Sequence, residues 1–311
     1  MIGTTSIRKP GLAINYKLYQ SLLSVFSKVA QAKLLRHRTA SNIVFDYYKL
    51  GPDFLPKIIY LHGFGDSKEG FILPSLGLIR DFQVIIPDLP GFGQRFDENL
   101  TYNSENYKKW LLEFVEEMGF EDFHLIGNSL GGALSLELAL EIPERIKTLT
   151  VLGSAGVYLE EYESIYDQIL EGKNIFHVKE RSDFDELMSG VFHKKPTFTK
   201  LMDRLVFEKY KSRASSYGII MDNIRQELQA HSETGFEAAS LNSKVSQIKS
   251  PTLIIWGRQD NFFPVEMGYF MRDQIKDSIL HVFEETGHCP HLERPSKFCS
   301  AVKDFVRKYE D

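Results

Sequence analysis

The chain has 311 residues and a mass of 35.8 kDa, and its hydrophobic (43%) and charged (25%) fractions are those of an ordinary soluble globular protein. The formal net charge of -5 argues against nucleic acid as the main partner, and two cysteines are too few for a disulfide framework or a cysteine metal site, so we expect a reducing, cytoplasmic compartment. No run of 18 apolar residues occurs, so we expect no membrane-spanning helix.

The first 45 residues are basic. They contain seven lysines and arginines and no acidic residue, which leaves a formal charge of -12 on residues 46–311. Apolar residues recur at helical spacing from Leu18 to Val29, which predicts a basic amphipathic helix within residues 1–42. Three interpretations fit such a helix: a peripheral membrane contact on an anionic surface, a targeting peptide, or a helix packed on the body with its charges solvated.

Beyond residue 42 the chain alternates between short apolar runs and amphipathic stretches. The runs are four to six residues long and rich in valine and isoleucine, as in strands buried on both faces of a parallel sheet. They cover Lys57–His62, Phe82–Ile86, Phe123–Ile126, Leu149–Leu152, Thr252–Trp256 and Ile279–Phe283. Helical spacing occurs in Asn106–Met118, in Leu130–Leu140 and near Val302–Val306. This alternation predicts a doubly wound, mostly parallel α/β sheet formed by residues 43–156 and 246–311.

Residues 157–245 interrupt the alternation, because they contain no convincing buried strand. Apolar residues at helical spacing from Phe184 to Phe192 indicate helices, and the segment holds eleven aromatic residues. We interpret the segment as a helical cap, or lid, inserted over one end of the sheet. Most of its aromatic side chains are expected to form the core of the cap itself.

The most informative segment joins the predicted strand Phe123–Ile126 to the predicted helix that begins at Leu130. Between them lies Gly127-Asn128-Ser129-Leu130-Gly131, the pattern G-x-S-x-G. A serine on a sharp strand-to-helix turn is raised above the sheet, and glycines on either side prevent collisions between strand and helix. The pattern therefore predicts Ser129 as a nucleophile. The alternative is a glycine-rich turn whose serine only caps the helix.

A second glycine-rich loop, His62-Gly63-Phe64-Gly65, follows the first central strand. In acyl transfer a negative charge develops on the former carbonyl oxygen, and preorganised N–H donors stabilise it. We expect the backbone N–H groups of Phe64 and Leu130 to form this oxyanion hole. His62 is interpreted as a structural residue that orients the loop, not as the catalytic base.

Two further polar residues follow the carboxyl ends of predicted strands, where an open α/β sheet binds its ligands. Asp260 comes after the strand Thr252–Trp256, and His288 comes after the strand Ile279–Phe283. His288 is expected to take the proton of Ser129, and Asp260 is expected to orient and stabilise the imidazole. Glu284 and Glu285 remain alternative acids. The other nearby histidines, His281 and His291, are not expected to be catalytic.

In combination, these motifs resemble those of the α/β-hydrolase family over residues 43–308. They are His62–Gly65, Pro87–Gly93, Gly127–Gly132, Gly257–Asp260 and Gly287–His288, in this order. More narrowly, Leu61–Lys68 and Gly153–Val157 are similar to the bacterial lipases and esterases and to the related animal monoacylglycerol lipases. That resemblance implies a serine hydrolase with a helical cap, often preceded by a hydrophobic or basic helix near a membrane.

The sequence departs from its relatives at two places. Gly93-Gln94-Arg95 replaces a common Gly-Asp-Ser or Gly-Ser run, and Cys289 follows His288 where the carbon–carbon hydrolases of ring-cleavage pathways usually carry tryptophan. The second departure weakens the carbon–carbon interpretation. Ser129 argues against the related dehalogenases and epoxide hydrolases, which use an aspartate nucleophile.

The sequence thus predicts a hydrolase that cleaves small apolar carboxylic esters of short- to medium-chain acids, with monoacylglycerols among the candidates, through an acyl-enzyme on Ser129. No metal or organic cofactor is implied, and the oligomeric state is left open. Two alternatives remain. One is a carbon–carbon bond hydrolase of the ring-cleavage-product type, and the other is a non-catalytic homologue that binds a small ligand.

Overall fold

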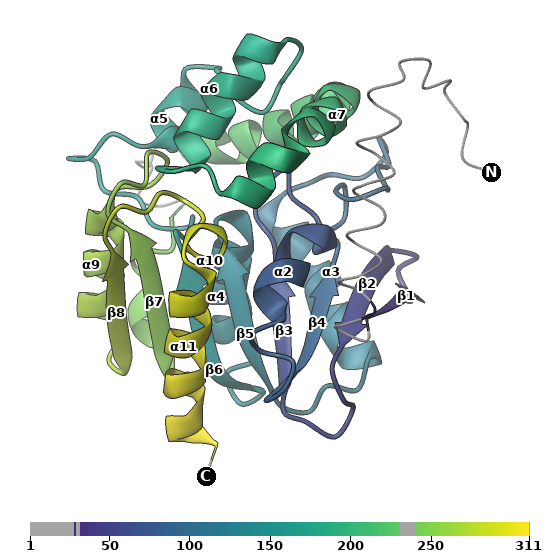
Figure 1. The fold of residues 1–311 in the computed structure, drawn as a ribbon, viewed down its shortest axis with the longest axis vertical. Coiled ribbons are helices and arrows are strands. Elements are labelled where there is room, and N and C mark those ends of the chain that lie inside the picture. Colours follow the sequence, from purple (N-terminus) through teal and green to yellow (C-terminus); the bar gives the residue numbers. More distant parts are fainter. Residues whose placement is uncertain (1–27, 29–31, 231–239, 311) are drawn as a thin grey trace.

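A twisted sheet of eight strands, in the order β1-β2-β4-β3-β5-β6-β7-β8, forms the centre of the computed structural model, which describes residues 28, 32–230 and 240–310 (Figure 1). The strands are β1 (Lys33–Arg38), β2 (Val44–Leu50), β3 (Lys57–Leu61), β4 (Gln83–Pro87), β5 (Phe123–Asn128), β6 (Ile146–Leu152), β7 (Thr252–Gly257) and β8 (Ser278–Phe283). Strands β3 to β8 run parallel, and β1 and β2 pair antiparallel at one edge. The six strands expected from the apolar runs are all present.

Helices cover both faces of this sheet. One face carries α3 (Ser104–Glu117), α4 (Leu130–Glu141) and α9 (Val265–Gln274), and the other carries α2 (Ile72–Ser75) and α11 (Pro295–Val306), with α10 (Pro290–Glu293) just before α11. Short 3-10 turns occupy η1 (Lys68–Phe71), η3 (Val245–Gln247) and η4 (Arg307–Tyr309). The predicted fold class, a doubly wound α/β-hydrolase-type sheet, is confirmed.

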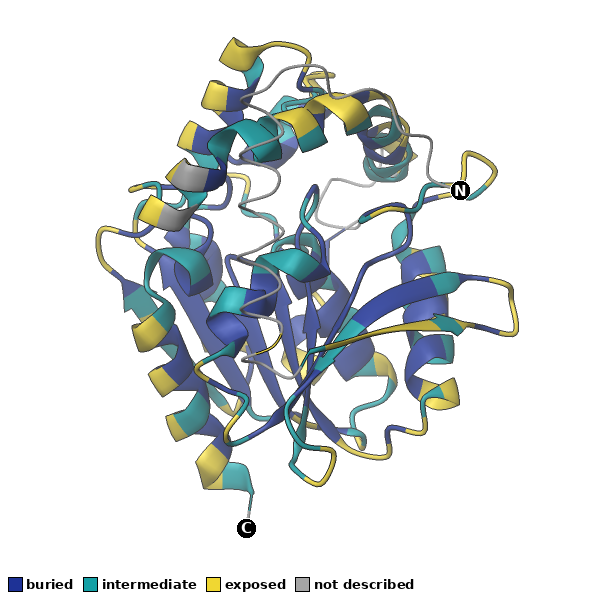
Figure 2. Cartoon of the chain, turned by 45° about the vertical axis from the view of Figure 1, so that its right-hand side comes forward, coloured by how far each residue is buried: buried dark blue, intermediate teal, exposed yellow. Residues whose placement is uncertain are grey.

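Alternate residues of the central strands face opposite helix layers. Ile58 and Tyr60 of β3 pack in the core that contains α11, whereas Ile59 and Leu61 pack in the core that contains α3 and α4. All four side chains are at most 1% exposed. Each fully buried side chain of this size contributes about 1.5–3 kcal/mol. Figure 2 shows the result, with buried residues filling the sheet and the inner sides of the helices.

The boundary predicted at residue 42 needs correction. Residues 33–38, which were expected to lie in the N-terminal helix, form the edge strand β1 instead. The reason is a partner that the local pattern does not reveal: β1 pairs antiparallel with β2, and Arg36 Nε donates to Asp46 Oδ1 at 2.6 Å. The helical spacing from Leu18 to Val29 lies outside the described residues, so the membrane contact of that segment stays a prediction.

Between β6 and β7 the described residues form helices that lie beyond the carboxyl ends of the strands (Figure 1). We refer to α5 (Ile165–Leu170), α6 (Arg181–Val191) and α7 (Thr197–Ala230) as the cap helices. Helix α7 is tied to the core at its carboxyl-terminal half. There Asn223 Oδ1 accepts a hydrogen bond from Tyr102 N at 2.8 Å, and the Glu227 carboxylate accepts from Ser104 N at the start of α3.

None of the described helices combines the length and the apolar character that a membrane crossing requires.

Replacing Gly127 by alanine should destabilise the fold, because a Cβ at this position of β5 would collide with Gly131 O and Ser135 Oγ of α4. We expect the free energy of unfolding to fall by about 1–3 kcal/mol or more in urea titrations. Gly218→Ala is the matched control. It adds a methyl group inside α7, 3.7 Å from its nearest neighbour, His177 Nδ1, and should stabilise the helix by about 0.5–1 kcal/mol. Equal stability of Gly127→Ala and wild type would refute this packing argument.

Candidate active site

Ser129 occupies the turn between β5 and α4, and its backbone is strained. Its dihedral angles are φ 54° and ψ -118°, which L-residues rarely adopt and which cost about 1–3 kcal/mol. The surrounding backbone holds the turn. Ser129 N donates to Leu152 O of β6 at 3.0 Å, and Ser129 O accepts from Gly132 N at 2.9 Å and from Ala155 N at 3.1 Å. The strand–turn–helix geometry expected for the G-x-S-x-G pattern is therefore present.

Asn128, which precedes Ser129, joins the ends of three segments. Its Nδ2 donates to Leu152 O at 2.9 Å and to His288 O at 3.3 Å. This amide thus connects β5, β6 and the loop after β8. The role of Asn128 was not predicted, although a polar residue at the end of an apolar strand, directly before the predicted nucleophile, is a usable signal.

Asp260 and His288 lie side by side, as predicted. His288 Nδ1 is 2.9 Å from Asp260 Oδ2, and the two side chains are 5% and 0% exposed. Asp260 Oδ1 accepts from the backbone N–H groups of Phe262 and Phe263 at 2.9 and 3.1 Å. A carboxylate only accepts hydrogen bonds, so we infer that Nδ1 carries the imidazole hydrogen. The lone pair of a neutral ring is then on Nε2, available to accept a proton.

Gly153 makes room for this pair at the end of β6. Its φ is +45°, and a Cβ there would come within 2.9 Å of Asp260 Oδ2 and 3.1 Å of His288 Nδ1. From the other side, His288 N donates to Val191 O at the end of α6, at 2.9 Å. The position of the imidazole is therefore set by the core and by the cap helices together.

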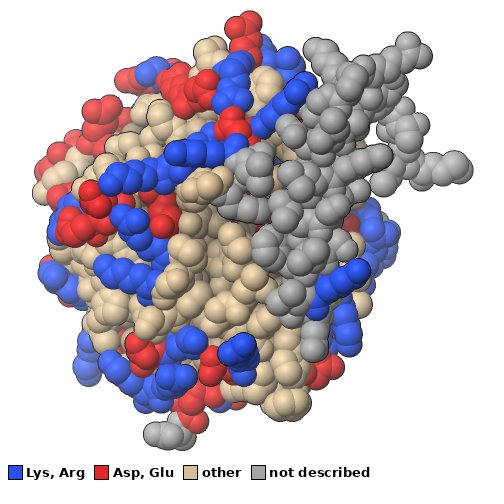
Figure 3. All heavy atoms as spheres, viewed as in Figure 1, with Lys and Arg blue, Asp and Glu red and all other residues tan. Residues whose placement is uncertain are grey.

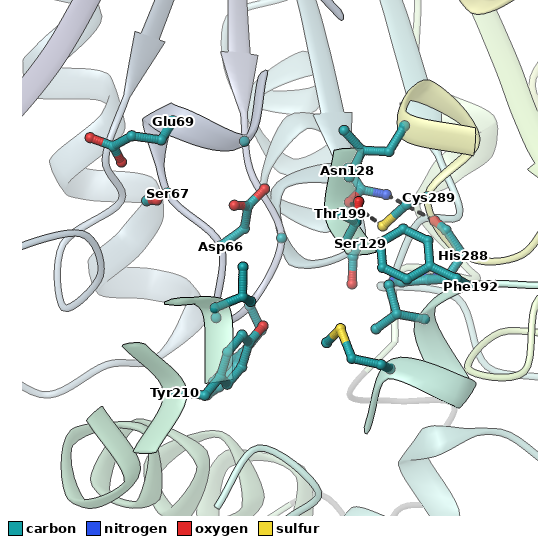
Figure 4. A pocket seen from close by; sticks show the side chains of 18 of the residues that line it. Asp66, Ser67, Glu69, Asn128, Ser129, Phe192, Thr199, Tyr210, His288 and Cys289 are labelled. Carbon is teal, nitrogen blue, oxygen red and sulfur yellow. Dashed lines mark hydrogen bonds between the residues drawn. The ribbon is translucent and has the colours of Figure 1, made fainter. Parts of the chain in front are cut away.

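Ser129 and His288 line the same cavity, which has a volume of about 210 Å³ and lies between the core and the cap helices (Figure 4). Within the described part of the chain, no hydrogen bond of 3.5 Å or less joins their side chains. Such contacts are often long before substrate binds. The structure thus brings all three predicted catalytic side chains to one location, and their chemical roles remain a prediction.

The two predicted oxyanion donors lie beside Ser129. Phe64 lines the cavity, and Leu130 is the first residue of α4, where N–H groups have no intrahelical partner. Among the described residues, neither N–H donates to a protein acceptor. The loop approaches the nucleophile closely, since a Cβ on Gly63 would lie 3.1 Å from Ser129 Cβ. Both N–H groups are therefore free to receive a ligand oxygen.

His62 orients this loop, in agreement with its predicted structural role. Leu89 N donates to His62 Nε2 at 3.0 Å, so Nδ1 carries the hydrogen and donates to Gly63 O at 2.8 Å. In a trans peptide the C=O of Gly63 and the N–H of Phe64 point in opposite directions. Fixing the Gly63 carbonyl therefore fixes the direction of the Phe64 N–H. Burial lowers the pKa of His62 to about 4, which keeps the ring neutral.

Helix α7 of the cap also contacts the loop that carries Phe64 and Gly65. Tyr217 of α7 is fully buried, and its hydroxyl donates to Gly65 O at 3.3 Å. Its ring centroid lies 5.6 Å from that of Phe64 in an edge-on arrangement. Neighbouring Arg213 donates to Gly93 O at 2.6 Å, which supplies the local contact at the unusual Gly93–Arg95 run. These contacts were not predicted, because they join residues 120 or more positions apart and no local sequence pattern indicates them.

The alternative acids pair with basic side chains, and the two other histidines lie away from the cavity. The Glu284 carboxylate accepts from Arg258, and the Glu285 carboxylate accepts from Lys194. His281 is exposed on β8. His291 is buried in α10 beside the Tyr60 hydroxyl, and burial lowers its pKa to about 3. None of these four lines the cavity that contains Ser129.

The cavity has an apolar wall and a polar end. The apolar wall is formed mainly by Phe64, Phe176, Met188, Phe192, Met202 and Val206. Cys289 also lines it, and burial raises the pKa of its thiol. Asp66, Ser67, Glu69 and Lys209 line the polar end. No group of three or more histidine, cysteine or acidic side chains in the described residues is arranged to hold a metal ion. On the face of the molecule that Figure 3 shows, basic and acidic side chains are interspersed.

Comparison with known proteins identifies the family. The family model described as alpha/beta hydrolase fold matches residues 56–295, so the chain belongs to the α/β-hydrolase fold family. It is 26% identical over 301 residues to a 2-hydroxy-6-oxo-6-phenylhexa-2,4-dienoate hydrolase of Comamonas testosteroni, covering 94% of this chain and 99% of the relative. It is also 27% identical over 252 residues to Lipase 1 of Psychrobacter immobilis, and the match covers 80% of this chain and 76% of that relative.

Among solved structures, the fold matches a membrane phospholipase A that is described as a bacterial virulence factor. The TM-score is 0.87 at 24% identity, and the match covers 96% of this chain and 93% of that protein. The predicted resemblance to bacterial lipases and esterases is confirmed, and the neighbours include dienoate hydrolases as well.

The neutral state of His62 makes stability depend on pH. Its pKa is about 4 in the fold and about 6.5 in an unfolded chain, so the unfolded state binds more protons between these values. The contribution of His62 is complete above about pH 6.5 and is lost as the pH falls toward 4. Between pH 7 and pH 5 the free energy of unfolding should therefore fall by about 2 kcal/mol more in wild type than in His62→Gln. Urea titrations at the two pH values measure this difference, and parallel profiles would contradict it.

Proposed function

We propose that this protein is a serine hydrolase that cleaves carboxylic esters of short- to medium-chain acyl groups through an acyl-enzyme on Ser129. The observation that carries the proposal is the convergence of three features at one cavity: a serine on a strained turn, a buried Asp260–His288 pair, and two unpaired N–H groups. Acyl transfer needs a nucleophile, a base with an orienting acid, and donors for the oxyanion.

Each group has a definite role in the proposed reaction. Ser129 Oγ attacks the ester carbonyl while His288 Nε2 takes its proton, and the N–H groups of Phe64 and Leu130 stabilise the negative oxygen. The alcohol leaves with the proton from His288, and an acyl-enzyme remains. A water then attacks the acyl carbonyl and gives a proton to His288, which returns it to Ser129 as the acid departs. Asp260 stabilises the imidazolium in both steps.

The cavity supports an apolar acyl group. Phe176 and the cap side chains Met188 and Met202 face it, and none of them offers a hydrogen bond to a polar chain. An acyl chain that leaves water for such a wall gains about 25 cal/mol per Å² of buried apolar surface. These apolar side chains offer no partner for a charged group on the acyl chain of a substrate.

Carbon–carbon bond hydrolysis is the second candidate, because the relative from Comamonas testosteroni is matched over nearly its whole length. Both candidates use the same nucleophile, so the substrate must separate them. A series of p-nitrophenyl esters of increasing chain length, assayed beside a dienoic ring-cleavage product, decides between the two. Turnover of the dienoic acid far above that of every ester would reverse our choice.

Covalent labelling tests the nucleophile. A fluorophosphonate probe should label the wild-type protein on Ser129 and should not label Ser129→Ala, because only an activated serine reacts. Ser135→Ala is the matched control, since Ser135 lies on the same helix α4, donates to Gly131 O and does not line the cavity. It should be labelled like wild type. Absence of labelling in a folded wild-type protein would favour the ligand-binding alternative.

Replacement of the acid tests the base pair. Asp260→Asn should lower kcat by about 10⁴-fold, because an amide favours the wrong imidazole tautomer. Thermal unfolding should show a folded variant. Glu284→Gln is the control, because Glu284 pairs with Arg258 at the surface, and its kcat should stay within twofold of wild type. Near-full activity of Asp260→Asn would remove Asp260 from the mechanism.

A further inference from the structure

The polar end of the cavity contains an ammonium and a carboxylate that are not paired with each other. Lys209 of α7 and Asp66 both line the cavity that contains Ser129, and Figure 4 shows Asp66 across the hollow from Ser129. Lys209 Nζ donates to Ser67 Oγ at 2.8 Å. In the described residues it has no carboxylate within 4.0 Å, and Asp66 receives no hydrogen bond from a side chain. Two charged groups therefore face the cavity with unused hydrogen-bonding capacity.

Lys68, in the same loop as Asp66, is fully paired with carboxylates. Lys68 Nζ lies 2.7 Å from Asp88 Oδ2 and 3.0 Å from Glu69 Oε1, and Lys68 N donates to Asp88 Oδ1 at 2.8 Å. Although burial alone would lower the pKa of Lys68, these two carboxylates raise it. Lys68 thus occupies the carboxylates of Glu69 and Asp88, and Asp66 remains the surplus acid.

Leaving these two charged groups with unused hydrogen-bonding capacity is unfavourable. Asp66 packs against Gly70, where a Cβ would collide with its carboxylate, and burial raises its pKa. Burial alone would lower the pKa of Lys209, but the neighbouring Tyr217 and Asp66 raise it, so the ammonium stays charged. Both side chains are half-buried, and further hydrogen-bond partners would stabilise their charges. A ligand in the cavity is in a position to supply these partners.

The chemistry of the two groups selects the ligand. An ammonium has three donors and no acceptor, whereas a carboxylate only accepts. A hydroxyl group satisfies both, since it accepts from Lys209 and donates to Asp66. The Asp66 carboxylate would repel an anionic ligand, and the Lys209 ammonium would repel a cationic ligand. An apolar alcohol would add no acceptor for Lys209 beyond Ser67 and no donor for Asp66.

We propose that Asp66 and Lys209 form a subsite that binds the free hydroxyl groups of a polyol, such as the glyceryl or sugar part of a partial ester. This inference rests on the proposed ester hydrolysis and assigns the two halves of the substrate. The acyl chain lies along Phe176, Met188 and Met202, and the alcohol half lies against Asp66 and Lys209.

A ratio of rates tests the subsite. The glyceryl monoester and the methyl ester of octanoic acid share the acyl chain and differ only in the hydroxyl groups. Asp66→Asn should lower the ratio of their kcat/KM values by about tenfold, because the amide oxygen is a neutral and weaker hydrogen-bond acceptor than the carboxylate. A glucose ester of the same acid distinguishes a sugar from a glyceryl group. An unchanged ratio in Asp66→Asn would overturn the subsite.

Glu69→Gln is the matched control. Glu69 also carries a carboxylate at the polar end, but Lys68 already occupies it, so the ratio should stay within twofold of wild type. If Glu69→Gln lowered the ratio of kcat/KM values as much as Asp66→Asn does, the cause would be a general electrostatic effect and not a specific contact. That result would overturn the subsite.

Binding without hydrolysis separates this inference from the proposed function. The octyl ether of glycerol and methyl octyl ether are not cleaved, and calorimetry measures their affinities for wild type and for Asp66→Asn. The affinity ratio of the two ethers should fall about tenfold in the variant. If neither octanoate ester is cleaved while this ratio falls, ester hydrolysis is refuted and the subsite stands. Failure of the glyceryl ether to bind wild type would refute the subsite.

Discussion

The hydrogen bond between His288 and Asp260 is the interaction on which the candidate site depends. The two residues lie on separate loops after β7 and β8, and the strands bring those loops together because parallel strands end at the same edge of the sheet. Gly153 leaves the space that the pair occupies, and Asn128 ties the His288 backbone to the end of β5. The packing of the sheet therefore fixes the orientation of the His288 imidazole.

The sequence was a good guide wherever the relevant signal was local. The apolar runs marked the central strands because both of their faces are buried, and the strand–turn–helix pattern around Ser129 is contained within about a dozen residues. Asp260 and His288 were found because each follows such a strand. Edge strand β1 was missed because most of it is exposed, so Lys33–Arg38 shows no alternation and depends on β2 for its structure.

The contacts made by α7 could not be predicted from the sequence, for a different reason. Lys209 and Tyr217 lie on an amphipathic helix, and their partners Ser67 and Gly65 are more than 140 residues away in the chain. In a helical pattern, such residues cannot be told apart from the solvated or core residues beside them. The same limitation applies to Asp66, whose importance depends on Lys68 occupying the other carboxylates of its loop.

The attachment of α7 has a mechanical consequence. Its Tyr217 and Lys209 hold the segment that carries the Phe64 N–H, while Asn223 fastens the helix further along. An outward swing of α7 would break the bond to Gly65 in the same movement that widens the entrance. The position of α7 and the position of the loop that carries Phe64 and Gly65 are therefore coupled, so a displacement of either one would disturb the other.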